Sequence, residues 1–301
     1  MAADNGAAVT QERFINVAPP GAPDTQGLQV PDRTLPLLRD LVNVSTGIHF
    51  ADDRLMYLRE RLGPLAIDRG FDSLLDYYYL LKYDKNADQE WARVIDTLSV
   101  QETYFWRESD QLSALVEQIL PRLAKAGRLS VCIWSIPCAS GEEPLSLAMA
   151  LEEHGWFDRL RIDLHAADAS EAALRKAAAG RYGARAFRQL SPAMREKYFT
   201  VESNGREWAV NPSLKARVAS WNRLNVVRPE ESARLCGADV IFCRNLFIYF
   251  TEATVRSVVD RFADLMRSPG ILCVGAAESL LRLTTRFELQ DVGGAYVYAR
   301  T

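Results

Sequence analysis

The chain has 301 residues, of which 48% are hydrophobic and 25% are charged, and its formal net charge at pH 7 is −3. This composition is typical of a folded globular protein with one large core or two domains, and it lacks the basic excess of a nucleic-acid binder. No apolar run approaches the roughly 20 residues that span a bilayer, and the N-terminus has no signal-peptide core, so we expect a cytoplasmic protein.

Cysteine and histidine usage points away from disulfides and metals. The five cysteines include no Cys-x-x-Cys pair, and most of them lie in apolar, strand-like runs. The three histidines are not spaced as metal ligands. We therefore expect small buried cysteines in a reducing compartment, and no metal site.

The N-terminal third is predicted to be helical after a flexible tail. Residues 1–30 are rich in Ala, Gly, Pro, Gln and Asp, a composition that buries too little to become ordered. From residue 31 to 110 leucines recur at three- and four-residue spacing and no strand pattern stands out. This region is interpreted as an all-α domain with its linker, and Gly63-Pro64 is predicted to end its second helix.

From residue 111 to 301 strands and helices alternate. Strands are predicted over 129–134, 161–167, 239–243 and 271–276, and helices over 143–153, 171–179 and 252–267. Repeated βα units predict a right-handed, doubly wound, mostly parallel sheet. The hairpin pattern over 287–300 adds an antiparallel edge, which is common in nucleoside-binding methyltransferase folds. Between about 187 and 225, short strands are predicted over 197–201, 207–210 and 217–221, joined by turns at Ser203-Asn204-Gly205 and Asn211-Pro212. They predict a small antiparallel β-subdomain.

A glycine turn follows the first predicted strand of this sheet. Gly141 would let backbone approach a ligand, and Pro144 suits the first turn of the helix that follows. There is no G-x-G-x-x-G, and Glu142 and Glu143 at the helix start would repel a pyrophosphate. A cationic or neutral ligand fits better, which favours S-adenosylmethionine over NAD or ATP. Alternatively, the two glutamates only stabilise the helix start.

Two further strand ends carry polar side chains. Asp168 ends the second strand, 27 residues after Gly141, where an acidic residue commonly accepts hydrogen bonds from a ribose diol. It could instead cap the next helix, although Ser170 can supply that cap and leave Asp168 free. Cys243-Arg244-Asn245 cuts short a buried strand, at the edge of the sheet where ligands bind. The alternative is a loop that happens to be polar.

The segment Gln101-Glu-Thr-Tyr-Phe-Trp-Arg107 lies between the two predicted domains. Arginine pairs well with carboxylates, because its fork contacts both oxygens. The alternative is a hinge whose aromatic residues, above all Phe105, belong to the core.

Taken together, these motifs resemble one family. Thr103-Tyr-Phe-Trp-Arg107, Cys138-Ala-Ser-Gly-Glu-Glu-Pro144, Asp168, Ile241-Phe-Cys-Arg-Asn245 with Ile248-Tyr-Phe250, and Pro269-Gly270 through Gly275-Ala-Ala-Glu-Ser279 are similar to the CheR family, in order along the chain. These are S-adenosylmethionine-dependent chemoreceptor glutamate methyltransferases. The departures are Gln101, where the family often has Asn, Leu145 in place of an aromatic, and Gly275-Ala-Ala-Glu278 in place of Gly-His-Ser-Glu.

The resemblance implies a Rossmann-like class I methyltransferase fold and a set of site residues. The positions implied to line the S-adenosylmethionine site are Gln101, Thr103, Arg107, Glu143, Asp168, Asn225 with Val226, and Cys243 with Arg244. Arg107 and Tyr249 are implied to face the methyl group and the receptor glutamate. The product of the cofactor would be S-adenosylhomocysteine.

The resemblance also implies a function and a partner. The expected activity is protein-glutamate O-methyltransferase on the cytoplasmic helices of a methyl-accepting chemoreceptor, by a monomer that reaches the membrane only through that receptor. Contacts are expected through the β-subdomain and the helical domain, where Arg54, Arg59, Arg61 and Arg69 form either a docking face or an ordinary solvated one. The alternative function is a regulatory module that binds S-adenosylmethionine without turnover. A methyltransferase for nucleic acids or small molecules is disfavoured, because Asn-Pro-Pro-Tyr and a basic excess are both lacking.

Overall fold

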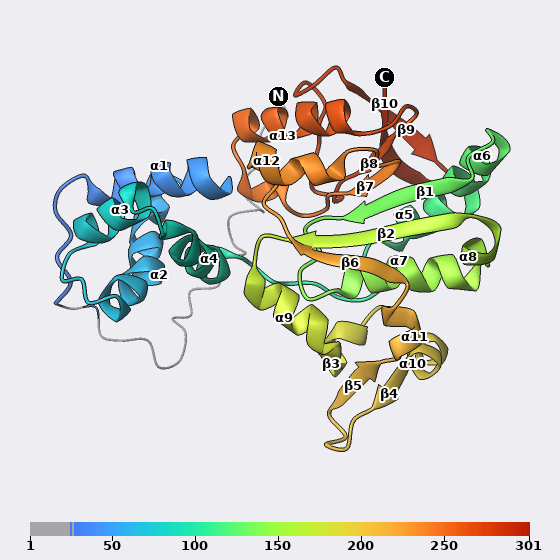
Figure 1. Cartoon of the computed structure of the whole chain (residues 1–301), viewed down its shortest axis with the longest axis horizontal. Helices are drawn as coiled ribbons and strands as arrows, with labels where there is room; N and C mark the ends of the chain where they lie inside the picture. Colours follow the sequence, from blue (N-terminus) through green and yellow to red (C-terminus); the bar gives the residue numbers. More distant parts are fainter. Residues whose placement is uncertain (1–24, 26) are drawn as a thin grey trace, which may run out of the picture. The chain divides into compact units, whose positions relative to one another are not determined.

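The computed structural model describes Thr25 and residues 27–301, so most of the tail expected over residues 1–30 lies outside the described residues. The chain forms two compact units (Figure 1). The first contains the residues up to Val100 together with Ile248–Thr251, and the second contains Gln101–Phe247 and Glu252–Thr301. Within the described part of the chain, no helix is both long and apolar enough to cross a bilayer.

The first unit is all-α, as expected. Its helices are α1 (Thr34–Thr46), α2 (Leu55–Asp68), α3 (Leu74–Tyr83) and α4 (Ala87–Leu98), with a short 3₁₀ turn, η2 (Asp52–Arg54). They enclose a core in which Leu38, Leu58 and Tyr77 are fully buried. Arg69, one of the four arginines of the expected basic face, forms an ion pair inside the helical unit: its Nε donates to the buried Glu90 carboxylate at 2.6 Å.

The prediction that α2 ends at Gly63-Pro64 is wrong. The helix continues to Asp68 with Pro64 inside it. A residue before proline is normally kept out of helical conformation by a clash that involves its Cβ, and Gly63 has none. The cost of the lost backbone hydrogen bond is opposed by burial of Ala66 in the next turn.

A short excursion from the second half of the sequence belongs to the first unit. Phe250 forms an antiparallel bridge with Ile48, and the His49 amide donates to the Tyr249 carbonyl at 2.9 Å. Tyr249 ends a 3₁₀ turn, η6 (Phe247–Tyr249). The backbone of Tyr249 is therefore held by the helical unit.

The second unit is built on a seven-stranded sheet in the order β6-β2-β1-β7-β8-β10-β9 (Figure 1). The strands are β1 (Ser130–Ser135), β2 (Arg161–Asp168), β6 (Val218–Arg223), β7 (Val240–Phe242), β8 (Ile271–Cys273), β9 (Phe287–Val292) and β10 (Ala295–Arg300). Neighbouring strands pair in parallel from β6 to β8, and β10 is antiparallel to both β8 and β9. The expected mostly parallel α/β sheet with a terminal antiparallel hairpin is confirmed.

Helices cover both faces of this sheet, and Figure 1 shows α7 and α9 on one side with α12 and α13 on the other. The longer helices are α7 (Glu142–Glu153), α9 (Glu171–Ala179) and α13 (Glu252–Leu265). A helical stretch that the sequence analysis did not anticipate precedes β1, as α5 (Ser109–Ala114), the π-helical η3 (Leu115–Ile119) and α6 (Leu120–Lys125). The shorter pieces are α8 (Trp156–Arg159), η4 (Ala184–Phe187), α10 (Pro192–Tyr198), α11 (Pro212–Lys215), α12 (Pro229–Ser232) and η5 (Ala233–Leu235).

The expected β-subdomain is present, and the strands predicted over 197–201 and 207–210 are confirmed as two of its three strands. It contains β3 (Arg181–Gly183), β4 (Phe199–Val201) and β5 (Glu207–Val210), in the order β3-β5-β4. Aromatic rings pack its inner face, with Phe187 and Phe199 4.9 Å apart between ring centroids. The assignment of Arg217–Trp221 to this insertion is wrong, because β6 pairs in parallel with β2 as the outer strand of the main sheet.

Candidate functional site

The carboxyl ends of the parallel strands gather polar side chains at one edge of the sheet. β1 ends at Ser135, β2 at Asp168 and β7 just before Cys243 and Arg244. Because these strands are parallel neighbours, their ends lie along the same edge. This is the edge where open α/β sheets bind ligands.

The turn between β1 and α7 is pinned to the end of β2. The Cys138 amide donates to the Ala167 carbonyl at 2.8 Å, and the Ala139 amide donates to Asp168 Oδ2 at 2.8 Å. Gly141 has φ +97°, and a Cβ at this position would come within 3.1 Å of the Trp221 ring. A glycine is therefore required here on both conformational and steric grounds.

Asp168 is buried and accepts backbone hydrogen bonds on both oxygens. In addition to Ala139, the Ser170 amide donates to Asp168 Oδ1 at 2.8 Å. Ser170 caps α9, as anticipated, by accepting from the Ala173 amide at 3.0 Å. The expectation that this cap leaves Asp168 free is nevertheless wrong. Since an ionised carboxylate offers about four lone-pair sites, Asp168 can still accept from a further donor such as a ribose hydroxyl.

Gln101 lies beside the same strand end. Its Nε2 donates to Ser170 Oγ at 3.1 Å, and its Oε1 accepts from Lys176 Nζ at 2.7 Å. Thr103 is half-buried two residues further along the same irregular segment. Gln101 is therefore held by the N-cap residue and by the last turn of α9.

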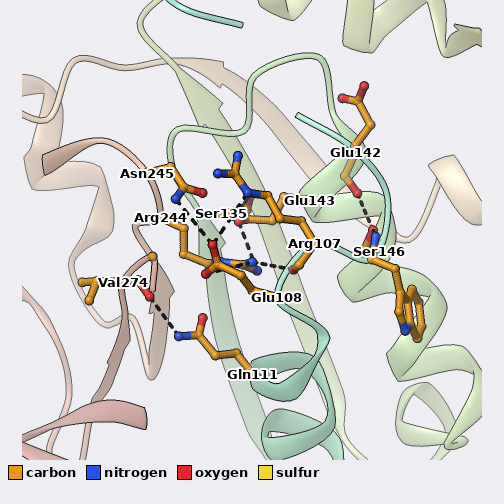
Figure 2. A network of polar contacts seen from close by, with 12 residues as sticks. Arg107, Glu108, Gln111, Ser135, Glu142, Glu143, Ser146, Arg244, Asn245 and Val274 are labelled. Atoms are coloured by element: carbon orange, nitrogen blue, oxygen red, sulfur yellow. Dashed lines mark hydrogen bonds and ion pairs between the residues drawn. The ribbon is translucent and has the colours of Figure 1, made fainter. Parts of the chain in front are cut away.

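Glu142 and Glu143 have different surroundings despite being neighbours. Figure 2 shows Glu142 directed away from the group formed by Glu143, Arg107 and Arg244. Glu142 accepts from Ser140 Oγ at 2.8 Å, and burial raises the pKa of its carboxyl. Glu143 accepts from Ser135 Oγ at 2.7 Å and lies 3.5 Å from Arg244 Nη1. Burial raises the pKa of Glu143 as well, although Arg244 and Ser135 oppose this shift.

Arg244 is the centre of a buried charge network (Figure 2). Its side chain is 1% exposed and lies between the Glu143 carboxylate and Glu108 Oε2, which is 3.4 Å away. Arg244 Nη2 also donates to the Arg107 carbonyl. Its Nε is buried and has no hydrogen-bond partner among the described residues. A ligand with an acceptor oxygen could satisfy this donor.

Arg107 is held in a strained turn. Trp106 and Glu108, on either side of it, both have positive φ angles, 66° and 51°. Such conformations are costly for residues with a side chain and cluster at functional sites. The turn is fixed because the Phe105 amide donates to the Ala186 carbonyl at 2.9 Å and the Trp106 amide donates to Ser146 Oγ at 3.0 Å.

The Arg107 guanidinium makes few polar contacts within the protein. Its Nη1 donates to the Glu102 carbonyl at 3.2 Å, and its Nε lies 3.7 Å from Glu108 Oε1. Its side chain is 18% exposed. Because a guanidinium has five N–H donors, most of its capacity to bind an oxyanion remains.

Asn225 and Val226 form a buried loop after β6. The Asn225 amide donates to Glu231 Oε2 at 2.7 Å, and the Val227 amide donates to Asn225 Oδ1 at 3.0 Å. Arg261 of α13 donates to the Val226 carbonyl at 2.8 Å and to the Val227 carbonyl at 3.2 Å. Two charged side chains therefore fix the path of this loop.

Cys243 is an inert part of the strand end. It is fully buried, burial raises the pKa of its thiol well above the usual value, and its amide donates to the Cys273 carbonyl at 2.8 Å. Any contact with a ligand would be made by its backbone or by the van der Waals surface of its sulfur.

Glu108, Ser135 and Glu278 are site residues that the sequence analysis missed. Glu278 Oε2 accepts from the amides of Asn245 at 2.8 Å and Gly275 at 2.6 Å, and its Oε1 accepts from the Phe247 amide at 2.6 Å. It therefore joins the loops after β7 and β8. The signal was the retained glutamate of Gly275-Ala-Ala-Glu278, which marked the motif without indicating a role.

The structure places Arg107, Glu143 and Arg244 in one network. Gln101 and Asp168 meet at the end of β2 through Ser170. Tyr249 belongs to the first unit.

Two family matches cover most of the chain. Residues 101–294 match the family described as "CheR methyltransferase, SAM binding domain", and residues 33–99 match "CheR methyltransferase, all-alpha domain". The chain belongs to the CheR methyltransferase family.

Relatives of this CheR chain carry consistent names. Chemotaxis protein methyltransferase 2 of Vibrio cholerae is 33% identical, over 84% of this chain and 87% of that protein. Chemotaxis protein methyltransferase 1 of Pseudomonas aeruginosa is 30% identical, over 87% of this chain and 96% of that protein. The recognised fold class and the methyltransferase assignment are thereby confirmed.

S-adenosylmethionine, the cofactor of this CheR family domain, fits the residues present. The molecule combines positive sulfonium and ammonium groups with a negative carboxylate. The Glu143 carboxylate, which is 15% exposed, suits the first two, and the buried unsatisfied Nε of Arg244 suits the third. The acidic start of α7 would not suit a pyrophosphate.

Proposed function

We propose that this CheR-family methyltransferase forms methyl esters on glutamate side chains of chemoreceptors. The observation that carries the proposal is the Arg107 guanidinium, which is fixed by a strained turn and keeps most of its donors. A bidentate fork of this kind matches a carboxylate acceptor. The names of the chemotaxis relatives support a receptor as the acceptor protein.

Methylation of a carboxylate requires few catalytic groups from the protein. An unperturbed glutamate titrates near about 4.3, so it is already ionised at neutral pH and needs no general base. S-adenosylmethionine supplies an electrophilic methyl group on a positively charged sulfur. Arg107 would orient the acceptor carboxylate, and the turn that holds Arg107 reduces the entropy lost in alignment. The Tyr249 hydroxyl would act on the same acceptor oxygen.

The remaining predicted residues would hold the cofactor. Asp168 would accept from the ribose, Glu143 and Arg244 would contact the amino-acid end, and the loop of Asn225 and Val226 would contact the adenine. The other positions of the proposed cofactor site are Gln101, Thr103, Arg107 and Cys243. Receptor contacts are assigned to the β-subdomain and to the helical unit. The cofactor contacts are assigned to the second unit, which begins at Gln101.

The alternative, a regulatory module without turnover, is not favoured. Both parts of the chain match methyltransferase families, and Arg107 and Tyr249 are both retained. A module that only binds the cofactor has no need of the Tyr249 hydroxyl.

Methyl transfer tests the proposal directly. The full chain is incubated with S-adenosylmethionine labelled in its methyl group and with the cytoplasmic fragment of a receptor encoded beside its gene. We expect label on the receptor that is released as methanol in mild alkali, because methyl esters are base-labile. A fragment with its acceptor glutamates replaced by alanine is the control. Absence of base-labile label on every such receptor would contradict the proposal, whereas binding of S-adenosylhomocysteine alone would support the regulatory alternative.

A further inference from the structure

A cavity of about 320 Å³ opens in the second unit, beside the site described above. Its walls come from the start of α5, the loop after β8 and the β9–β10 hairpin. This volume is at the lower end of those that hold small ligands or single side chains. None of the residues discussed so far as cofactor contacts lines it.

Gln111 supplies a buried acceptor without a partner. Its Nε2 donates to the Val274 carbonyl at 2.9 Å and to the Tyr296 carbonyl at 3.3 Å, and the residue is 8% exposed. Its Oε1 is buried and accepts no hydrogen bond from any residue that the structure describes. Figure 2 shows the amide nitrogen of Gln111 turned to Val274 and the oxygen turned away from it. A buried unsatisfied acceptor is costly, so the cavity suits a ligand that donates.

The acidic side chains that line the cavity favour a positively charged ligand as the hydrogen-bond donor. Glu108, Asp110 and Glu278 line it, and none of its lining residues in the described part of the chain is basic. Glu108 is balanced by Arg244, and Glu278 is stabilised by three backbone amides. Asp110 is exposed at the rim. No cation of the described cavity wall therefore neutralises Asp110.

The rim of the cavity is apolar. Leu281 is 59% exposed, Leu289 37% and Tyr296 66%, and all three line the cavity. Lysine and arginine bury an alkyl stem along apolar surface and place the charged head among polar groups. An apolar rim over an acidic, hydrogen-bond-accepting floor is complementary to such a side chain.

We propose that this cavity binds a lysine or arginine side chain of the receptor segment that is being methylated. The inference rests on the proposed function. Glu108 lines the cavity and also lies 3.7 Å from Arg107 Nε, so the cavity adjoins the residue proposed to orient the acceptor. On a helix, residues three or four apart are neighbours at about 5–6 Å. We expect a cation one turn from the acceptor glutamate to enter the cavity, so that the cavity selects which glutamates are methylated.

Direct binding tests the site without any methyl transfer. The full chain, labelled with ¹⁵N, is titrated with n-butylguanidinium and, as an uncharged control of similar shape, with n-butylurea. We expect saturable shifts of the Gln111 side-chain amide with the guanidinium only. Asp110→Asn should weaken this binding several-fold, while Asp158→Asn, an exposed first-turn aspartate of α8, should not. Equal responses to both probes, or none to the guanidinium, would overturn the site.

Methylation kinetics test whether the cavity binds the receptor substrate. In a receptor fragment, the cation one turn from a methylated glutamate is replaced by methionine. We expect KM to rise about 10-fold, which is about 1.4 kcal/mol, with kcat nearly unchanged. With the Asp110→Asn enzyme, the same replacement in the receptor should raise KM much less, because both changes remove the same interaction. Independent, additive effects would overturn the proposal while leaving glutamate methylation intact. Failure to methylate any glutamate would instead remove the proposed function and leave the probe-binding result standing.

Discussion

The two arginines of this site, Arg107 and Arg244, have opposite environments, which indicates different roles. Arg244 is 1% exposed and is shared between Glu108 and Glu143, so it mainly holds acidic groups in place. Arg107 is 18% exposed and makes one side-chain hydrogen bond within its unit. A buried, paired cation organises a site, whereas a partly exposed one is available to a substrate.

Arg107→Lys tests whether the fork or the charge matters. Lysine keeps the positive charge and loses the planar pair of donors, so most of the methyl transfer to receptor should be lost. Arg107→Ala should be lower still by about 10-fold, as about 1.4 kcal/mol in the barrier would give. Circular dichroism and thermal melting should stay close to wild type, because the side chain is not in the core. A lysine variant with near-normal turnover would contradict the orienting role.

Glu142 provides a prediction of pH dependence. Burial raises the pKa of Glu142 in the folded protein, so ionisation of this group opposes folding. Glu142→Gln should therefore raise the free energy of unfolding at pH 7. The gain should shrink as pH falls through the raised pKa of folded Glu142, and it should vanish below about 4.3, where wild-type Glu142 is protonated in both states.

Denaturant unfolding at several pH values measures this difference. Glu196→Gln, at an exposed position, is the matched control and should change little at any pH. A Glu142→Gln variant that loses stability at pH 7 would mean that the charge stabilises the start of α7 and is not penalised by burial.

At the scale of elements, the best-predicted parts were those with a strong local signal. β1, α7 and the β9–β10 hairpin were found within a residue or two, because apolar runs and glycine turns bound them. The stretch 109–125 was missed although Leu112, Leu115 and Ile119 repeat at three- and four-residue spacing. β6 was assigned to the wrong sheet, since a short apolar run does not reveal which strand it pairs with.

Within the site, strand-end residues were easier to anticipate than their partners. Asp168 and Arg244 follow apolar runs and are visible in the sequence. Glu278 is separated by more than thirty residues from the Asn245 amide that it accepts from, and only tertiary structure brings them together. Contacts between distant loops have no periodic signature, which is why Glu108 and Glu278 were not identified.

The loop of Asn225 and Val226 depends on an element distant in sequence, and this gives a prediction for Arg261 of α13. Arg261 donates to the carbonyls of Val226 and Val227. Arg261→Met keeps much of the side-chain volume and removes these donors. We expect the Kd for S-adenosylhomocysteine to rise by roughly 5- to 30-fold, about 1–2 kcal/mol. Arg256→Met, an exposed position on the same helix, is the control in the same calorimetric titration. Unchanged affinity would show that the loop keeps its path without Arg261.

At the scale of the whole molecule, the two units divide the predicted site residues between them. All of the proposed cofactor contacts lie in the second unit, and Tyr249 alone of the predicted residues lies in the first. Its backbone carbonyl accepts from His49, and the adjacent Phe250 pairs with Ile48. The chain thus leaves the α/β unit after Phe247, contributes four residues to the helical unit, and returns at Glu252. Nothing local in the sequence indicates this excursion.

This division predicts that Tyr249 affects turnover and not cofactor affinity. Tyr249→Phe removes the hydroxyl proposed to act on the acceptor oxygen and leaves the backbone contact with His49 in place. We expect kcat for receptor methylation to fall by about 10-fold or more, which corresponds to about 1.4 kcal/mol in the barrier. The Kd for S-adenosylhomocysteine should stay nearly constant, because the cofactor contacts belong to the other unit. Tyr79→Phe, an exposed tyrosine of α3, should change neither quantity. Equal losses in kcat and cofactor affinity would place Tyr249 in the cofactor site and contradict its assignment to the methyl acceptor.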